Sequence, residues 1–136
     1  MNDMQVIRYG DDLVREVVRI LSSENIFPKR SRWIFGDSIM ETARNFYVSM
    51  HLANELKPLT ANEANERRLY MVRGFSYLKT LDAIMTFAAD VHGVAPSKIE
   101  RFSGNYIRVY DLYQGWLRRE NNTYKAKWPK YAGDRQ

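Results

Sequence analysis

Four stretches of the chain repeat apolar residues at steps of three and four, and this spacing limits the fold more than any other feature. A helix with 3.6 residues per turn places such residues on one side, where they can be buried together. The stretches cover about residues 3–24, 37–56, 61–91 and 98–120, with short connections between them. The sequence therefore predicts an all-α protein, an up-down-up-down four-helix bundle within residues 1–120.

Capping signals mark where two of these helices should begin. Thr60 and Glu63 have the spacing of a capping box, in which each side chain satisfies an amide that the other residue leaves open. Ser97 and Glu100 repeat the same spacing before the last stretch. We therefore expect helices to start near residues 61 and 98. Gly10 is expected to interrupt the first helix, at a cost of about 1 kcal/mol relative to alanine.

The net charge of +5 is concentrated in two segments. The segment around Pro28 contains Lys29, Arg30 and Arg32 without an acidic residue, and residues 121–136 contain four basic residues and one acidic residue. Because proline lacks an amide donor and disfavours helix in the residue before it, we expect the first cluster to lie in a turn. Clustered cations are typical of a surface that binds phosphate polymers. A solubilising surface is the alternative.

The bundle topology predicts where the cations gather. Its first and third connections lie at the same end, so their basic residues should be neighbours, and other cations mark the opposite end and the sides. Residues 121–136 lack helical periodicity and interleave lysine with tyrosine and tryptophan, so we expect a tail that orders on contact with nucleic acid or protein. The candidate nucleic-acid-binding residues are Lys29, Arg30, Arg32, Arg67, Arg68, Arg73, Lys79, Lys98, Arg101, Arg108, Arg118, Arg119, Lys125 and Lys127.

The stretch 61–91 carries two apolar rows, more than one four-helix core can bury. The second row is either the wide face of a central helix or a surface for neighbouring subunits, and we favour self-association. The candidate interface residues are Tyr47, Tyr70, Tyr77, Leu81 and Ile84.

Several classes of chemistry are not expected. The chain has no cysteine and two histidines, so disulfides and thiolate metal sites are excluded, and a zinc site would need carboxylates. No phosphate-binding glycine loop and no nucleophile paired with a base are evident. We predict a protein without catalytic residues, metal or cofactor. Asp11 is expected on a solvated face, Asp82 is expected to pair with an arginine, and His92 is expected to act as a cation at a helix end.

Membrane association is not expected either. No run approaches the roughly 20 apolar residues that a membrane span requires, and the first residues do not form a targeting signal. The sequence therefore predicts a cytoplasmic protein that does not bind membranes.

A spread pattern of residues resembles one known family. The pattern consists of Phe27-Pro28-Lys29-Arg30, Arg32, Phe35-Gly36, Ala53-Asn54, Arg68-Leu69 and Gly115-Trp116-Leu117-Arg118. Over residues 5–119 it resembles the accessory variability determinant (Avd) proteins of diversity-generating retroelements. The resemblance implies a barrel-like homopentamer of four-helix bundles without catalytic activity. It also implies binding to the retroelement template RNA and to the reverse transcriptase during mutagenic cDNA synthesis, with the cDNA as a further candidate ligand.

Two alternatives remain open beside this interpretation. Proteins encoded in ribosomal RNA intervening sequences share the four-helix-bundle architecture that the resemblance implies. A purely protein-binding oligomeric scaffold would also explain the apolar excess, although it would leave the clustered cations without a role.

Overall fold

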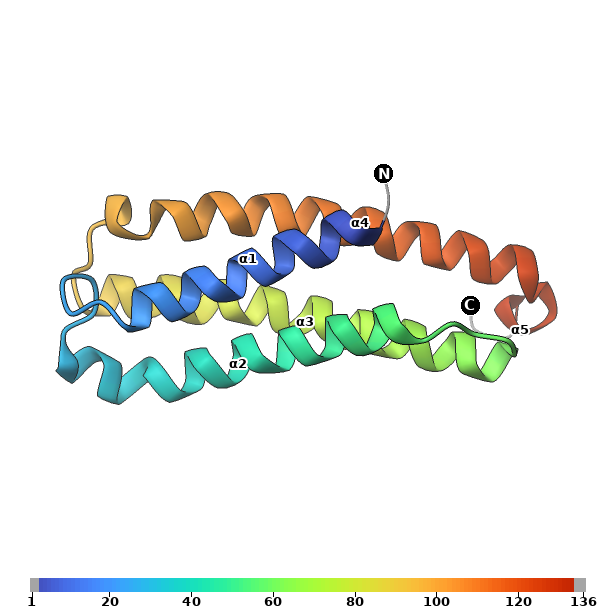
Figure 1. The fold of residues 1–136 in the computed structure, drawn as a ribbon, viewed down its shortest axis with the longest axis horizontal. Helices are drawn as coiled ribbons and strands as arrows, with labels where there is room; N and C mark the ends of the chain where they lie inside the picture. Colours follow the sequence, from blue (N-terminus) through green and yellow to red (C-terminus); the bar gives the residue numbers. More distant parts are fainter. Residues whose placement is uncertain (1–2, 134–136) are drawn as a thin grey trace.

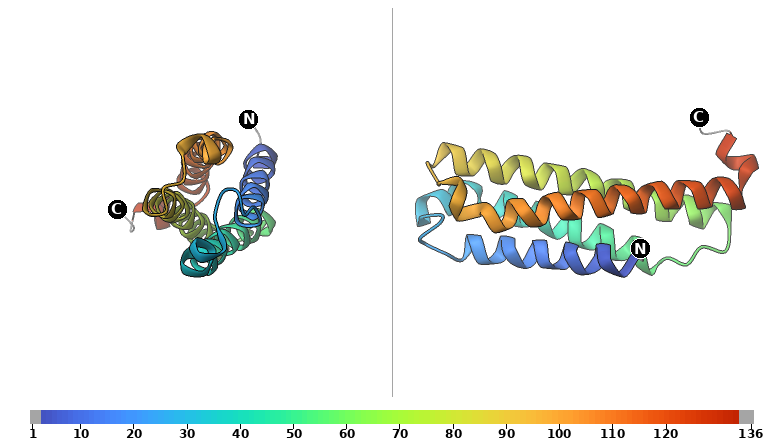
Figure 2. Two further views of the ribbon diagram at one scale, coloured as in Figure 1. Left: turned by 90° about the vertical axis from the view of Figure 1, so that its left-hand side faces the viewer. Right: turned by 90° about the horizontal axis from the view of Figure 1, so that it is seen from above.

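The computed structural model describes residues 3–133 and consists of helices, with no strand in that part of the chain. Four long helices lie alongside one another (Figure 1), and viewed from one end they surround a common centre (Figure 2). The helical bundle predicted from the sequence is confirmed at this level. The elements are α1 (Asp3–Leu21), α2 (Lys29–Glu55), α3 (Ala61–Val91), η1 (Pro96–Ile99), α4 (Glu100–Lys127) and α5 (Pro129–Gly133).

One hydrophobic core occupies the space between the four long helices. Val17, Phe46, Leu78 and Phe102, one from each helix, are all 0% exposed, and Trp116 is 1% exposed. Burying a side chain of this size contributes about 1.5–3 kcal/mol relative to leaving it in water. The apolar side chains that the sequence spacing placed on one face of each helix therefore form the core that holds the helices together.

Two glycines allow helices to approach closely. α1 continues through Gly10 without the expected interruption, and Met50 of α2 occupies the space that a Cβ at this position would need. A Cβ at Gly74 of α3 would overlap the Tyr113 hydroxyl oxygen, which donates a hydrogen bond to the Met71 carbonyl at 2.7 Å. At both positions a side chain of a neighbouring helix therefore packs against the glycine backbone.

α3 has the bounds that the sequence predicts, and its start is confirmed in detail. Thr60 Oγ1 accepts a hydrogen bond from the Glu63 amide at 3.1 Å, and Glu63 Oε1 accepts one from the Thr60 amide at 3.1 Å. The predicted capping box is therefore present. The connection from Leu56 to Thr60 carries no helix and links α2 to α3 at the end opposite to the α1–α2 connection (Figure 1).

The second predicted capping box, between Ser97 and Glu100, was wrong. Pro96 begins a 3₁₀ turn that ends at Ile99, and α4 starts at Glu100 without a side-chain cap. Proline fits the first position of such a turn because its fixed φ is already helical. Ser97 therefore lies inside the turn and does not cap α4.

α2 begins at Lys29 rather than near residue 37. Pro28 occupies the N-cap position with φ −58° and ψ 158°, so the helix starts directly after it. The expected turn at Lys29, Arg30 and Arg32 was wrong, and these residues lie on the first turns of α2. A proline disfavours helix in the residue before it, not in the residue after it.

α4 continues to Lys127, so the expectation of a non-helical segment after residue 120 was wrong. Tyr124 is 2% exposed and packs with Ala64 of α3, and Trp128 covers this contact. One buried side chain produces no visible apolar period, which explains why the sequence did not predict this helix. Residues 134–136 of the predicted tail lie outside the described part of the structure.

Candidate nucleic-acid interface

The start of α2 brings two cations and an exposed tryptophan together. Lys29 and Arg30 are exposed, and Trp33 is 90% exposed. The three side chains line one surface hollow, and the first turn of α2 contains no acidic residue. Arg32 lies differently, because its guanidinium faces the Leu21 carbonyl at 3.4 Å and the Glu24 carboxylate at 3.5 Å. The sequence analysis missed Trp33, whose exposure is set by packing.

A second basic group lies at the start of α4, at the same end of the bundle (Figure 1). Lys98 and Arg101 are exposed and line a hollow together with Arg19, Ser97 and the acidic residue Glu100. The Lys98 Nζ also donates a hydrogen bond to the Asn25 carbonyl at 2.8 Å, which connects η1 to the α1–α2 connection. The predicted neighbours at this end therefore form two groups, with Lys29 and Arg30 lining one hollow and Lys98 and Arg101 the other, while Arg32 lines neither.

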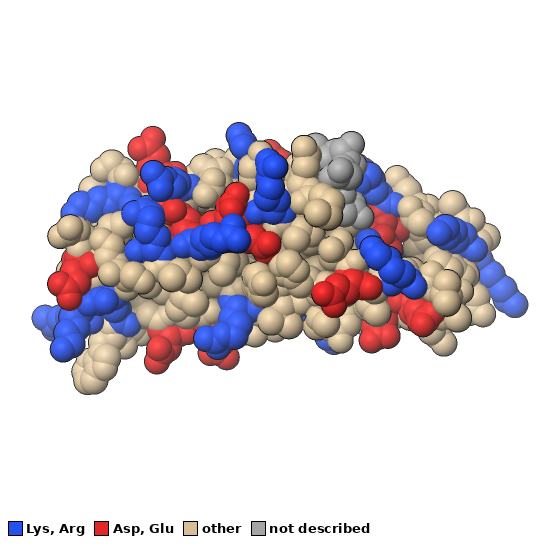
Figure 3. Space-filling view, in the orientation of Figure 1, with Lys and Arg blue, Asp and Glu red and all other residues tan. Residues whose placement is uncertain are grey.

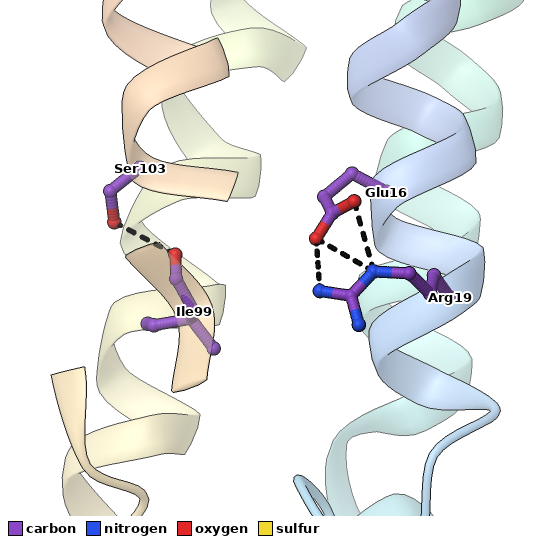
Figure 4. Close-up of polar contacts among 4 residues, drawn as sticks. All are labelled: Glu16, Arg19, Ile99 and Ser103. Atoms are coloured by element: carbon purple, nitrogen blue, oxygen red, sulfur yellow. Dashed lines mark hydrogen bonds and ion pairs between the residues drawn. The ribbon is translucent and has the colours of Figure 1, made fainter. Parts of the chain in front are cut away.

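Carboxylates neutralise part of the face formed by α1 and α4. Arg19 forms hydrogen bonds through its Nε to both Glu16 carboxylate oxygens at 3.0 Å, and Glu16 is 5% exposed (Figure 4). This hydrogen bond raises the pKa of Arg19, despite an opposing effect of desolvation. Arg19 is therefore an ion-pair partner for Glu16 rather than a free cation. On the neighbouring α4, the Ser103 hydroxyl donates to the Ile99 carbonyl at 3.2 Å (Figure 4).

Arg67, one of the candidate RNA contacts, is a buried structural residue. It is 6% exposed and donates through Nη1 to the carbonyls of Ala53 at 2.7 Å and Leu56 at 2.9 Å. Its Nε lies 3.1 Å from Glu120 Oε1 of α4. The prediction that Arg67 contacts nucleic acid was wrong, because the guanidinium is used inside the bundle to join α2, α3 and α4.

The other candidate cations at the end of the bundle where α3 begins and α4 finishes are more accessible than Arg67. Arg68 is half-buried, with its guanidinium 4.2 Å from the Tyr124 ring and its Nε donating to Asn121 Oδ1 at 3.0 Å. Arg119 is half-buried as well. Arg118, Lys125 and Lys127 are exposed. Basic side chains of α4 therefore remain on the surface at this end, although Arg67 no longer counts among the candidate nucleic-acid-binding residues.

The three candidates along the sides are all exposed and lie over aromatic rings. Arg73 is 5.9 Å from the Tyr70 ring centroid, Lys79 is 4.7 Å from that of Phe75, and Arg108 is 5.0 Å from that of Tyr9. A cation over a ring gains about 0.5–1 kcal/mol at an exposed site. These contacts hold the side chains in place while the charges stay in solvent.

Tyr9 also contacts Arg8, a cation that the sequence analysis missed. Arg8 Nη2 donates to the Tyr9 hydroxyl at 3.2 Å, and Arg108 of α4 lies over the same ring. The hydrogen bond from Arg8, followed by the effect of Arg108, lowers the pKa of Tyr9. No sequence signal places residues 8 and 108 together, because the contact depends on how α1 packs against α4. Figure 3 shows blue side chains over this face, interrupted by red carboxylates.

Two acidic residues have partners that differ from those expected. Asp11 Oδ1 lies 2.7 Å from His51 Nε2, so Asp11 links α1 to α2 and does not simply face solvent. None of the described lysines or arginines forms an ion pair with Asp82, which contradicts the arginine pair predicted for it. Burial raises the pKa of Asp82, and a hydrogen bond with Thr86 partly opposes this effect.

Within residues 3–133, no three histidine, aspartate or glutamate side chains gather closely enough to hold a metal ion. The His92 ring packs edge-on against Phe35 at 5.4 Å between centroids, and its Nε2 has no hydrogen-bond partner among the described atoms. His92 is the C-cap residue of α3 through its backbone, and its ring is a packing element. Among the described helices, none combines the length and the apolarity needed to cross a membrane.

The candidate oligomer interface changes on the structure. Leu81 is 0% exposed and belongs to the core, so its assignment to an interface was wrong. Tyr47 is 42% exposed, and Tyr70, Tyr77 and Ile84 are half-buried against the core. A different row on α3 is exposed and uncharged, and it comprises Leu69, Val72, Ser76, Thr80, Ala83, Phe87 and Val91.

Comparison with protein-family models found no match, and comparisons with curated proteins and with solved structures found none either. The family resemblance therefore remains a prediction that the sequence pattern alone carries.

Proposed function

We propose that this protein is a non-catalytic RNA-binding adaptor of the accessory variability determinant type. In this proposal it binds the template RNA of a diversity-generating retroelement and the reverse transcriptase, and it supports mutagenic cDNA synthesis. The fold would be an up-down-up-down bundle that assembles as a barrel-like homopentamer. The observation that carries RNA binding is the start of α2, where Lys29 and Arg30 stay exposed without a carboxylate partner among the described residues.

The wider charge distribution supports the same proposal. Ten of the fourteen candidate cations are exposed, three are half-buried and only Arg67 is buried. A duplex or a folded RNA presents phosphates along its length, and cations at both ends and along the sides of a bundle can contact them together. An RNA-binding adaptor needs no catalytic group.

Salt dependence tests the RNA contact directly. With about 6–10 phosphate contacts, affinity should fall by about 10³–10⁵ between 50 and 200 mM salt. A filter-binding titration with a structured RNA measures this slope. Absent binding, or binding that does not change with salt, would contradict the proposal.

A matched pair of variants locates the contact. Lys29→Glu with Arg30→Glu should weaken RNA binding, whereas Arg44→Glu with Lys57→Glu makes the same charge change at exposed positions outside the candidate set. Circular dichroism should show unchanged helicity for both. Equal loss of affinity in the two double variants would mean that net charge, not the start of α2, determines binding.

The uncharged row on α3 supports self-association. Leu69, Val72, Phe87 and Val91 are 47–58% exposed, and the row extends over about 33 Å at 1.5 Å per residue. The apolar members lie on either side of Ser76 and Thr80, and exposed apolar side chains grouped on one face are typical of protein interfaces. Light scattering should give about five times the 16.1 kDa chain mass, and Val72→Glu with Phe87→Glu should reduce it. Ile107→Glu, at a position 61% exposed on α4, is the control.

The alternative of a ribosomal RNA intervening-sequence type protein also fits the helical bundle. Co-purification with a retroelement reverse transcriptase distinguishes the two, because only the retroelement adaptor is expected to bind it. RNA-independent binding to a protein partner together with salt-independent behaviour toward RNA would favour the protein-binding scaffold instead.

A further inference from the structure

Trp33 is more exposed than any other large apolar side chain of the described residues. It is 90% exposed, whereas Trp116 is 1% exposed and Trp128 is half-buried. Keeping an indole in water forgoes the gain of burying it, and Trp33 makes no contribution to the core. Its exposure therefore needs an explanation outside the fold.

The surroundings of Trp33 are cationic on one side only. Lys29 and Arg30 precede it by four and three residues, so all three side chains lie on the same face of α2, and they line one hollow. Neither cation forms an ion pair with a described residue. Asp37 follows Trp33 by four residues on the same face and is exposed. The basic surface therefore ends at Trp33, which limits a polyanion to a short contact here.

These features favour unpaired RNA over other occupants. In a duplex the base faces are stacked on one another, so a flat indole has nothing to stack on, and phosphate contacts alone would require only Lys29 and Arg30. An unpaired nucleotide offers both a ring face and a phosphate. An anionic membrane would attract the same cations, but Asp37 and the exposed Glu41 one turn later would face the lipid headgroups and repel them.

We propose that Trp33 is a stacking platform for one or two unpaired RNA nucleotides, with Lys29 and Arg30 binding the adjoining phosphates. This inference rests on the proposed RNA-binding function and specifies which part of an RNA enters this site. A loop, a bulge or a free end can supply such nucleotides, whereas a continuous duplex cannot.

The test compares single-stranded and double-stranded RNA on stacking variants. Trp33→Leu should weaken binding of a 12-nucleotide oligouridine by about 5- to 150-fold, the loss expected for one stacked base. The same variant should leave affinity for a 12-base-pair RNA duplex unchanged. Trp33→Phe should retain most of the single-strand affinity because it keeps an aromatic face. Ile34→Ala, at a neighbouring position 58% exposed, controls for loss of apolar surface.

Fluorescence gives a second readout of the same contact. Stacking of a base on Trp33 should quench the emission of the wild-type protein on addition of oligouridine. Trp33→Phe should abolish this quenching, and Trp128→Phe should preserve it. Because Trp33 lies outside the core, the Trp33 variants are expected to melt within about 2 °C of wild type.

The outcomes separate this inference from the proposed function. If wild type binds RNA and Trp33→Leu binds oligouridine equally well, the stacking site is refuted and RNA binding stands. Equal losses for single strand and duplex would also refute stacking. Trp33-dependent sedimentation with phosphatidylserine vesicles, without a Trp33 effect on RNA, would assign the site to a membrane. If wild type binds neither RNA, the proposed function and the inference both fail.

Discussion

Replacing Arg67 by methionine should destabilise the bundle strongly, because one guanidinium joins three helices. It donates to the Ala53 and Leu56 carbonyls at 2.7 and 2.9 Å and pairs with Glu120 at 3.1 Å. Methionine has a similar length but leaves a carboxylate that is 13% exposed without its partner. Breaking a buried pair from one side costs about 3–5 kcal/mol. With an unfolding entropy of about 2.1 cal/mol/K per residue, Tm should fall by about 10–18 °C.

Thermal unfolding followed by circular dichroism measures this loss. Arg73→Met is the matched control on the same helix, because Arg73 is exposed and its removal should cost only the contact with the Tyr70 ring, about 0.5–1 kcal/mol. Adding Glu120→Gln to Arg67→Met should recover part of the loss, since the unpaired charge is then removed. A Tm for Arg67→Met within about 2 °C of wild type, combined with lost RNA affinity, would refute the structural role and return Arg67 to the RNA-binding set.

Three further substitutions test the packing and the electrostatics by thermal melting. Gly74→Ala should cost about 1–3 kcal/mol because its Cβ would overlap the Tyr113 hydroxyl, whereas Gly104→Ala, with open space around it, should stabilise by up to about 1 kcal/mol; the reverse order would contradict the packing. Thr60→Ala should cost about 1 kcal/mol through loss of the capping box, and an unchanged Tm would show that the box is unimportant. Burial raises the pKa of Asp82 above its ordinary 3.8, so its ionisation lowers the free energy of unfolding as pH rises through the folded-state pKa. Asp82→Asn should therefore raise Tm at pH 7 and not at pH 3, and an equal effect at both would contradict this assignment.

The helices were largely predictable because their signals are local. The bounds of α3 and its capping box follow from residues within a few positions of each other, as does the apolar face of α1. The starts of α2 and α4 were placed wrongly because a proline fits several positions at a helix start. Pro28 is an N-cap and Pro96 begins a 3₁₀ turn, and neighbouring residues do not distinguish these roles.

The candidate site was only partly predictable, because accessibility depends on which helix lies opposite. Arg67 and Arg68 are adjacent in sequence, yet one is buried beside Glu120 and the other lies over Tyr124. Trp33 reads as a core residue by type, but no helix packs over it. Whether a cation can contact a ligand therefore depends on how accessible its side chain is in the folded protein.

The sequence by itself determined that the chain is helical, that its helices can bury apolar faces in a core and that it carries an excess of cations. These properties follow from the 3.6-residue apolar period and from composition, and neither depends on distant contacts. Only the tertiary structure decided which cations are neutralised and which apolar residues stay in water. The reason is that burial, and ion pairs and ring contacts between helices, join side chains far apart in the chain, as the contacts between Arg67 and Glu120 and between Tyr9 and Arg108 show. A pair within one helix, such as Arg19 and Glu16, is local in the sequence.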